Sequence, residues 1–214
     1  MYQLMQKLLQ AKPHLGTVLT TSQITAVVRK VVGSNHIRVI SQRSDVVDHN
    51  MICVGGFFDS EAEWDKECSI ELVLYYHPLQ QHMDPAHLDW ERLAFEVAET
   101  LGHEQVHKDQ SHRRRKRIRG YVSKGKSRAE QEYLGNEDEI EAYGYSIAAE
   151  MLFRLNITDM DDFRMGEIAV WNEYQELFAD DQSVLLKLRR NISKYLRRLE
   201  INNEQSNKDG PGST

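Results

Sequence analysis

The chain has 214 residues and a formal net charge of −6, and 40% of its residues are hydrophobic while 28% are charged. This balance supports a globular core with a very polar surface, and the net charge gives no overall case for nucleic-acid binding. Cys53 and Cys68 are too few for a disulfide framework, and no stretch approaches 18 apolar residues. We therefore expect a cytoplasmic protein with reduced thiols, no signal peptide and no contact with a membrane.

The first 76 residues contain two helical patterns followed by three strand patterns. Apolar residues at helical spacing predict a short helix over 2–11 and a second over 21–33, although the β-branched content of the second also fits a strand. Residues 37–40 and 51–54 read as strands, and the second is followed by Gly55-Gly56 and an apolar Phe57-Phe58. The clearest strand is 69–76, with apolar residues on one face and mixed residues on the other.

The remainder of the chain is helical in pattern. A long helix is predicted over about 88–109, and a second long helix from Gly135 or Asn136 to about 155. Further helical segments follow, the last of them a basic amphipathic helix over 184–201. Because strands precede helices without regular alternation, we predict an α+β fold with a small antiparallel or mixed sheet packed on a pair of long helices. One domain spans 1–202, and 203–214 has the composition of a disordered tail.

The first long helix carries the motif His-Glu-x-x-His at residues 103–107. On a helix, His103 and His107 lie one above the other, so both imidazoles can point to one metal ion. Glu104 lies beside His103 and can reach a water molecule at the metal without binding the metal itself, as a general base requires. The motif therefore indicates a zinc site with two histidine ligands.

A catalytic zinc needs a third protein ligand and one open position. The second long helix begins with Asn136 and carries Glu137, Glu139 and Glu141. The spacing alone leaves all three glutamates open as the third ligand.

The motif at 103–107, followed by Glu139-Ile140-Glu141-Ala142, resembles the gluzincin branch of zinc metallopeptidases. The likeness extends over about 75 residues, and the segment is also similar to small metallopeptidase-like proteins of tailed phages. This resemblance implies a zincin-like pair of helices, Zn²⁺ as the cofactor and Glu139 as the third ligand. Many members have Asp or Asn after the small residue as support for a histidine, whereas this chain has Tyr143.

The expected activity is hydrolysis of a peptide bond by a zinc-activated water, with Glu104 as general base. Tyr143 and Tyr121 are the foremost candidates to stabilise the oxyanion, and Tyr133, His112 and the nearby arginines also qualify. An extended peptide is expected to pair with the strand at 69–76. If the protein is phage-encoded, it acts in the cytoplasm of the host cell.

A basic segment separates the two long helices. Residues 111–129 contain nine basic side chains and no acidic one. We expect a mobile loop over 113–130, which is either a solvated loop without a partner, a lid over the cleft, or a weak contact for substrate, an acidic protein or a nucleic acid through its first arginines. These are Arg113, Arg114, Arg115 and Arg117.

Two other functions stay open at this point. The first alternative is a metallopeptidase-like protein that keeps the fold but acts in binding or assembly. The second is a nucleic-acid or partner-binding protein that uses residues 113–128. The sequence does not specify the substrate, beyond a peptide or protein, or the oligomeric state.

Overall fold

The computed structural model describes residues 1–14, 18–59, 69–80, 82–83, 88–113, 128–158 and 167–208. The chain forms two compact units, residues 1–105 and 106–214, and the boundary falls within the continuous helix α4 (Trp90–Arg113). Because one helix belongs to both units, this division does not test the prediction of a single domain.

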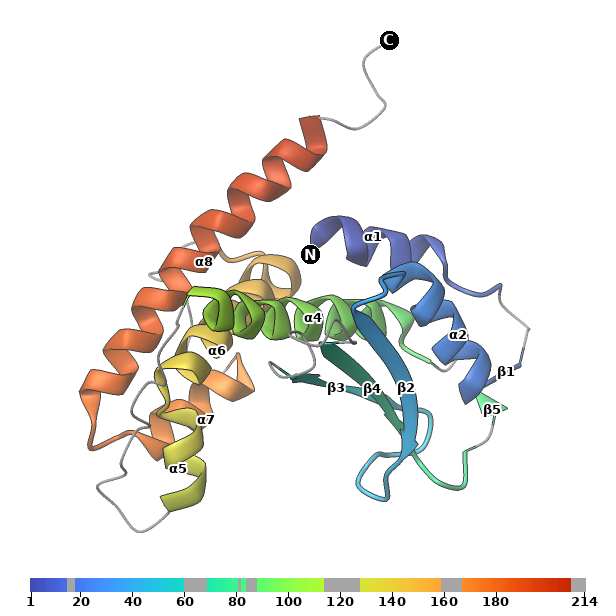
Figure 1. Cartoon of the computed structure of the whole chain (residues 1–214), viewed down its shortest axis with the longest axis horizontal. Coiled ribbons are helices and arrows are strands. Elements are labelled where there is room, and N and C mark those ends of the chain that lie inside the picture. The colour runs from blue at the N-terminus through green and yellow to red at the C-terminus, as the bar shows by residue number, and fades with distance from the viewer. Residues whose placement is uncertain are drawn as a thin grey trace. The chain divides into compact units, whose positions relative to one another are not determined.

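Unit 1 is built on a three-stranded mixed sheet in the order β2-β4-β3 (Figure 1). Strand β4 (Ile70–Tyr76) lies in the centre, parallel to β2 (Ile37–Arg43) and antiparallel to β3 (Ile52–Phe58). A two-stranded antiparallel ladder, β1 (Leu19–Thr20) with β5 (His82–Met83), accompanies it. The α+β class and the small mixed sheet are therefore confirmed.

The central position of β4 corrects one prediction. We expected a peptide to pair with residues 69–76, but both edges of β4 are already bonded to β2 and β3. The central position of β4 is also visible in its burial on both faces: Leu72 and Leu74 on one face and Val73 on the other are at most 7% exposed. Within the described part of the chain, no strand pairs with the outer edge of β3.

Helices α1 (Tyr2–Gln10) and α2 (Thr21–Val32) complete unit 1, and α2 packs over β2 (Figure 1). The segment 21–33 is helical rather than extended because Thr20 and Gln23 form a capping box and Gly33 ends the helix with φ 37°. The first half of α4 contributes Leu93, Val97 and Leu101 to the core of this unit.

Unit 2 is helical in its described part. Helix α5 (Arg128–Leu134) precedes α6 (Glu137–Glu150), which continues into a π-helical turn, η1 (Met151–Leu155). Helices α7 (Ala169–Leu177) and α8 (Gln182–Lys208) follow, and both pack against α6 (Figure 1).

The approach of α8 to α6 depends on Gly144. A Cβ at this position would lie 2.6 Å from the Asn191 Cβ, so a larger residue would push the helices apart. Helix α8 also runs to Lys208, six residues into the segment that the sequence assigned to a disordered tail, and residues 209–214 lie outside the described part.

Among the helices described here, none combines the length and hydropathy that crossing a membrane requires.

Candidate metal centre

Helix α4 places His103 and His107 on one face, one turn apart. The helix starts where the Asp89 carboxylate accepts a hydrogen bond from the Arg92 amide at 2.9 Å. Its apolar side is buried, and this fixes the rotation of the helix and hence the direction of the histidine face. Both histidines are half-buried.

Helix α6 supplies Glu139 in its first turn. The Asn136 side chain caps the helix by accepting a hydrogen bond from the Asp138 amide at 3.1 Å. An acidic first turn is favourable because the helix dipole is positive at this end. Ile140 and Ala142 are at most 1% exposed, so their burial sets the orientation of Glu139.

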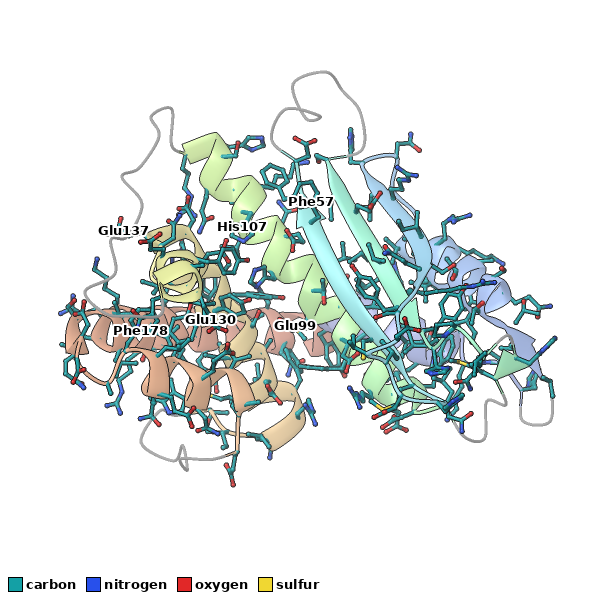
Figure 2. All side chains as sticks on the ribbon, turned by 90° about the horizontal axis from the view of Figure 1, so that it is seen from below. Phe57, Glu99, His107, Glu130, Glu137 and Phe178 are labelled. Atoms are coloured by element: carbon teal, nitrogen blue, oxygen red, sulfur yellow. The ribbon has the colours of Figure 1, made fainter. Side chains whose placement is uncertain are left out.

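The ligating atoms of His103, His107 and Glu139 all lie within 4.8 Å of one another, and this cluster can hold a metal ion. Figure 2 shows His107 on α4 with α6 beside it. The His107 Nε2 and Glu139 Oε1 atoms are 3.6 Å apart. Two ligands at about 2.1 Å from a tetrahedral zinc are separated by about 3.4 Å, so this distance fits two corners of a zinc site.

The two other glutamates of the first turns of α6 are engaged elsewhere. Glu137 is half exposed and accepts a bond from the Lys187 ammonium at 3.0 Å. Glu141 is 5% exposed and is surrounded by donors. Of the three glutamates that spacing left open, only Glu139 belongs to the cluster.

Glu141 is the centre of a buried ion-pair network. Its carboxylate accepts bonds from the Lys194 ammonium at 2.5 Å and the Tyr195 hydroxyl at 3.1 Å, and the Arg113 guanidinium lies at 3.3 Å. Burial by itself would raise the pKa of this carboxyl. Hydrogen bonds from Lys194 and Gln110, with the charges of Lys194 and Arg113, outweigh burial and lower the pKa to about 2.

Glu104 is not a member of the three-residue cluster. It is 6% exposed, and its carboxylate reaches the edge strand β3, where a Cβ on Gly56 would lie 2.6 Å from its Oε1 atom. The same Cβ would lie 2.6 Å from the Thr100 methyl group. Gly56 therefore lets β3 pass directly against α4, and Figure 2 shows Phe57 on this strand and Glu99 on the helix.

Gln110 is a site residue that the sequence reasoning missed. It is 2% exposed, and its Oε1 atom lies 3.0 Å from the Nδ1 atom of His107. Its amide nitrogen donates to the Asp138 carbonyl at 2.9 Å and to Glu141 Oε2 at 3.1 Å. The only available signal was its position three residues after His107 on the same helix.

Two tyrosines adjoin Glu139. The hydroxyl of Tyr133 forms side-chain hydrogen bonds with Glu139 and Tyr143, and burial together with the Glu139 charge raises the pKa of Tyr133. The Tyr143 ring packs edge-on against Tyr174, with centroids 5.9 Å apart. The role of Tyr143 at an oxyanion stays a prediction, and Tyr121 lies outside the described residues.

The predicted mobile loop, 113–130, is described only at its two ends, and both ends are helical: residue 113 closes α4, and residues 128–130 begin α5. Arg113 belongs to the end of α4 and pairs with Glu141. Arg114, Arg115 and Arg117 lie outside the described residues, so their contacts stay predictions.

No family model matches the chain, and no curated protein or solved structure matches it either.

Proposed function

We propose that this protein is a zinc-dependent peptidase of gluzincin type. The observation that carries the proposal is the convergence of His103, His107 and Glu139 within 4.8 Å. These residues come from two helices, and the third of them is separated from the others by more than 30 positions.

The donor set fits zinc. Two imidazole nitrogens and one carboxylate are the ligands of many catalytic zinc sites, which keep a fourth position open. With the Nδ1 atom of His107 donating to Gln110, its Nε2 atom presents a lone pair toward the Glu139 carboxylate. A lone pair and a carboxylate at this distance repel each other, so a cation bound between them is stabilising. When bound there, zinc acts as a Lewis acid that polarises a carbonyl and acidifies water.

Glu104 is the group of this chain that moves the proton. It follows His103 directly on α4, and its burial against β3 strengthens its electrostatic interactions with reacting groups. In the proposed reaction the Glu104 carboxylate takes a proton from the attacking water and delivers it to the leaving amine. Carboxylate burial also limits competing proton exchange with bulk water.

The outer edge of β3 is the proposed platform for substrate. An extended peptide can add to this edge through main-chain hydrogen bonds, and Gly56 leaves the strand without a side chain beside Glu104. This arrangement brings the peptide backbone next to the proposed base. It replaces the pairing with 69–76 expected from the sequence.

The test uses the full-length protein, reduced and carboxymethylated casein as substrate, and metal analysis of each variant. We expect one zinc per chain and casein cleavage that stops with a chelator. Glu104→Gln should retain the zinc and lose at least about 100-fold in rate, because the base is removed while the ligands remain. Glu99→Gln, on the same helix but outside the cluster, is the matched control and should remain active.

Absence of bound zinc would contradict the metal centre. Bound zinc without cleavage of casein or of a mixed peptide library would remove the peptidase proposal, and would favour a metallopeptidase-like protein that acts in binding or assembly.

A further inference from the structure

The orientation of the Gln110 amide is determined by its surroundings. Its nitrogen faces the Asp138 carbonyl and the Glu141 carboxylate, and both of these groups can only accept hydrogen bonds. A flipped amide would place its oxygen against two acceptors in a buried position. The Oε1 atom must therefore face His107.

The orientation of Gln110 then fixes the tautomer of His107. An amide oxygen only accepts, so the Nδ1 atom of His107, 3.0 Å away, must carry the hydrogen. The Nε2 atom of the neutral ring is left with its lone pair, on the side of Glu139. This is the form of histidine that binds a metal.

Glu141 holds Gln110 in turn. Its carboxylate accepts from the Gln110 amide and is fixed by Lys194 and Tyr195 of α8. The chain of contacts thus runs from α8, through Glu141 and Gln110, to the proposed ligand.

We propose that Gln110 is the positioning residue of the metal site, that it sets the tautomer and ring orientation of His107, and that Glu141 sets the orientation of Gln110. The inference rests on the proposed metal site.

The first measurement reads the tautomer directly, by nitrogen-15 NMR of histidine-labelled protein without metal. We expect the Nδ1–H form for His107 in the wild type. Gln110→Met, which fills a similar volume but offers no amide oxygen, should shift His107 toward the Nε2–H form. Gln110→Glu, which keeps an acceptor oxygen, should retain the Nδ1–H form.

The second measurement is zinc affinity, by competition with a chromophoric chelator. Loss of a partner of a metal-binding histidine typically costs about 10–100-fold in affinity, and we expect this for Gln110→Met. The matched control is Gln131→Leu, which removes the bond from another glutamine of unit 2 to the Leu177 carbonyl. It should change the affinity by less than about threefold.

A wild-type His107 in the Nε2–H form, or unchanged zinc affinity in a folded Gln110→Met protein, would overturn the inference. Neither result depends on peptide cleavage. If the tautomer and affinity respond as expected but casein is not cleaved, the positioning role stands and the peptidase proposal fails.

A second and independent feature is the outer face of α8. Residues 182–199 contain six basic side chains and no acidic one, although the whole chain has a net charge of −6. Arg190 and Arg197 lie two helical turns apart on this face, about 10 Å along the helix axis, and Lys194, whose ammonium pairs with Glu141, lies between them. They line a shallow hollow of about 370 Å³ with Leu186, Arg189 and Ser193.

The chemistry of this hollow fits phosphate groups better than a protein surface. Protein interfaces usually centre on aromatic or other apolar anchors, whereas interfaces with nucleic acids are polar and strongly positive. Leu186 is the one exposed large apolar side chain in the lining. We infer that this face of α8 binds the phosphate backbone of a nucleic acid without sequence preference.

The test measures fluorescence anisotropy of a labelled 20-nucleotide DNA strand at several salt concentrations, with a chelator present. Arg190→Gln/Arg197→Gln should weaken binding at least about tenfold at low salt. For this double variant, the magnitude of the slope of log affinity against log salt should decrease by about 1.4, because each lost contact with a single strand contributes about 0.7. Lys7→Gln/Lys30→Gln in unit 1 removes the same charge and should leave the slope unchanged.

No binding by the wild type at low salt, or the same slope in both double variants, would overturn this inference. Tighter binding of a polyglutamate peptide than of DNA would also overturn it and would indicate an acidic protein segment as the partner.

Discussion

At the scale of single residues, three glutamates of α6 that are chemically identical differ in burial and in their partners. Three glutamates stand in the first five residues of α6, yet each has a different surrounding. Glu137 is in solvent, Glu139 faces the histidines, and Glu141 is buried among cations. Their roles follow from these surroundings rather than from their chemistry as isolated residues.

This difference predicts unequal effects of the same substitution. Glu139→Gln should lower zinc affinity by more than about 100-fold, because it removes a charged ligand and not merely a supporting group. Glu137→Gln should have almost no effect, since its exposed pair with Lys187 contributes only about 0–1 kcal/mol. Chelator competition measures both, and equal affinities for the two variants would place the third ligand elsewhere.

Gly56 is the second residue whose replacement is informative. A methyl group there would meet Glu104 and Thr100 at 2.6 Å, so Gly56→Ala should displace Glu104. We expect a loss of about 1–3 kcal/mol in stability and at least about tenfold in casein cleavage, because small displacements of catalytic groups are costly. Urea unfolding and initial rates measure these effects.

Gly55→Ala provides the comparison for Gly56. Its methyl group would meet the edge of the Tyr75 ring at 2.8 Å, and this half-buried side chain can rotate away. Cleavage by Gly55→Ala should stay close to wild type. Full activity in Gly56→Ala would contradict the placement of Glu104 beside the substrate edge.

At the scale of elements, the sequence predicts features that depend on neighbouring residues of one helix. It does not predict features that depend on contacts between distant parts of the chain. The spacing of His103 and His107 is local, and one helix was enough to predict that they share a face. Gln110 acts through groups 28 and 31 positions away, a relation that no local pattern records. The zinc identity and the gluzincin assignment stay predictions.

The order of the strands in the sheet is likewise a long-range feature that the sequence did not predict. Residues 69–76 were correctly assigned to a strand, but their place in the sheet depends on which strands bond to them. Burial of Val73 on the face opposite Leu72 and Leu74 is the mark of a central strand, and the sequence shows it only as an imperfect alternation.

The contact of α4, α6 and α8 around Glu141 predicts an acid-sensitive fold. The pKa of the Glu141 carboxyl is about 2 in the folded chain, against 4.5 ordinarily, so the folded state binds this proton more weakly than the unfolded state does. The resulting stability is complete above pH about 4.5 and is lost as the pH falls toward 2. It amounts to on the order of 2 kcal/mol, since solvent partly screens the cations.

Urea unfolding between pH 2 and 6, with a chelator present, measures this contribution. Glu141→Gln should be less stable than wild type at pH 6, and the difference should shrink toward pH 2. Glu137→Gln should follow the wild-type curve throughout. A constant difference between Glu141→Gln and wild type would show that the ion pairs of Glu141 contribute no acid-side stability.

At the scale of the whole molecule, binding of a metal to the folded state must stabilise it. Zinc at about 100 times its dissociation constant should add about 2.7 kcal/mol, which corresponds to a rise in Tm of about 5–10 °C for a chain of this size. Glu139→Gln should lose this rise, and magnesium should not produce it in the wild type. Differential scanning calorimetry gives the result, and an equal zinc effect in Glu139→Gln would indicate binding away from the cluster.

The strand order β2-β4-β3 has a consequence for how the chain reaches this fold. Partners in the β3–β4 pair are as close as 12 positions, from Phe58 to Ile70, whereas every β2–β4 pair is separated by 33 positions. Closing the longer loop costs about 1 kcal/mol more in chain entropy, so the antiparallel pair forms sooner. During synthesis β2 leaves the ribosome first of the three strands, and it must wait unpaired until β4, the last of them, has been made.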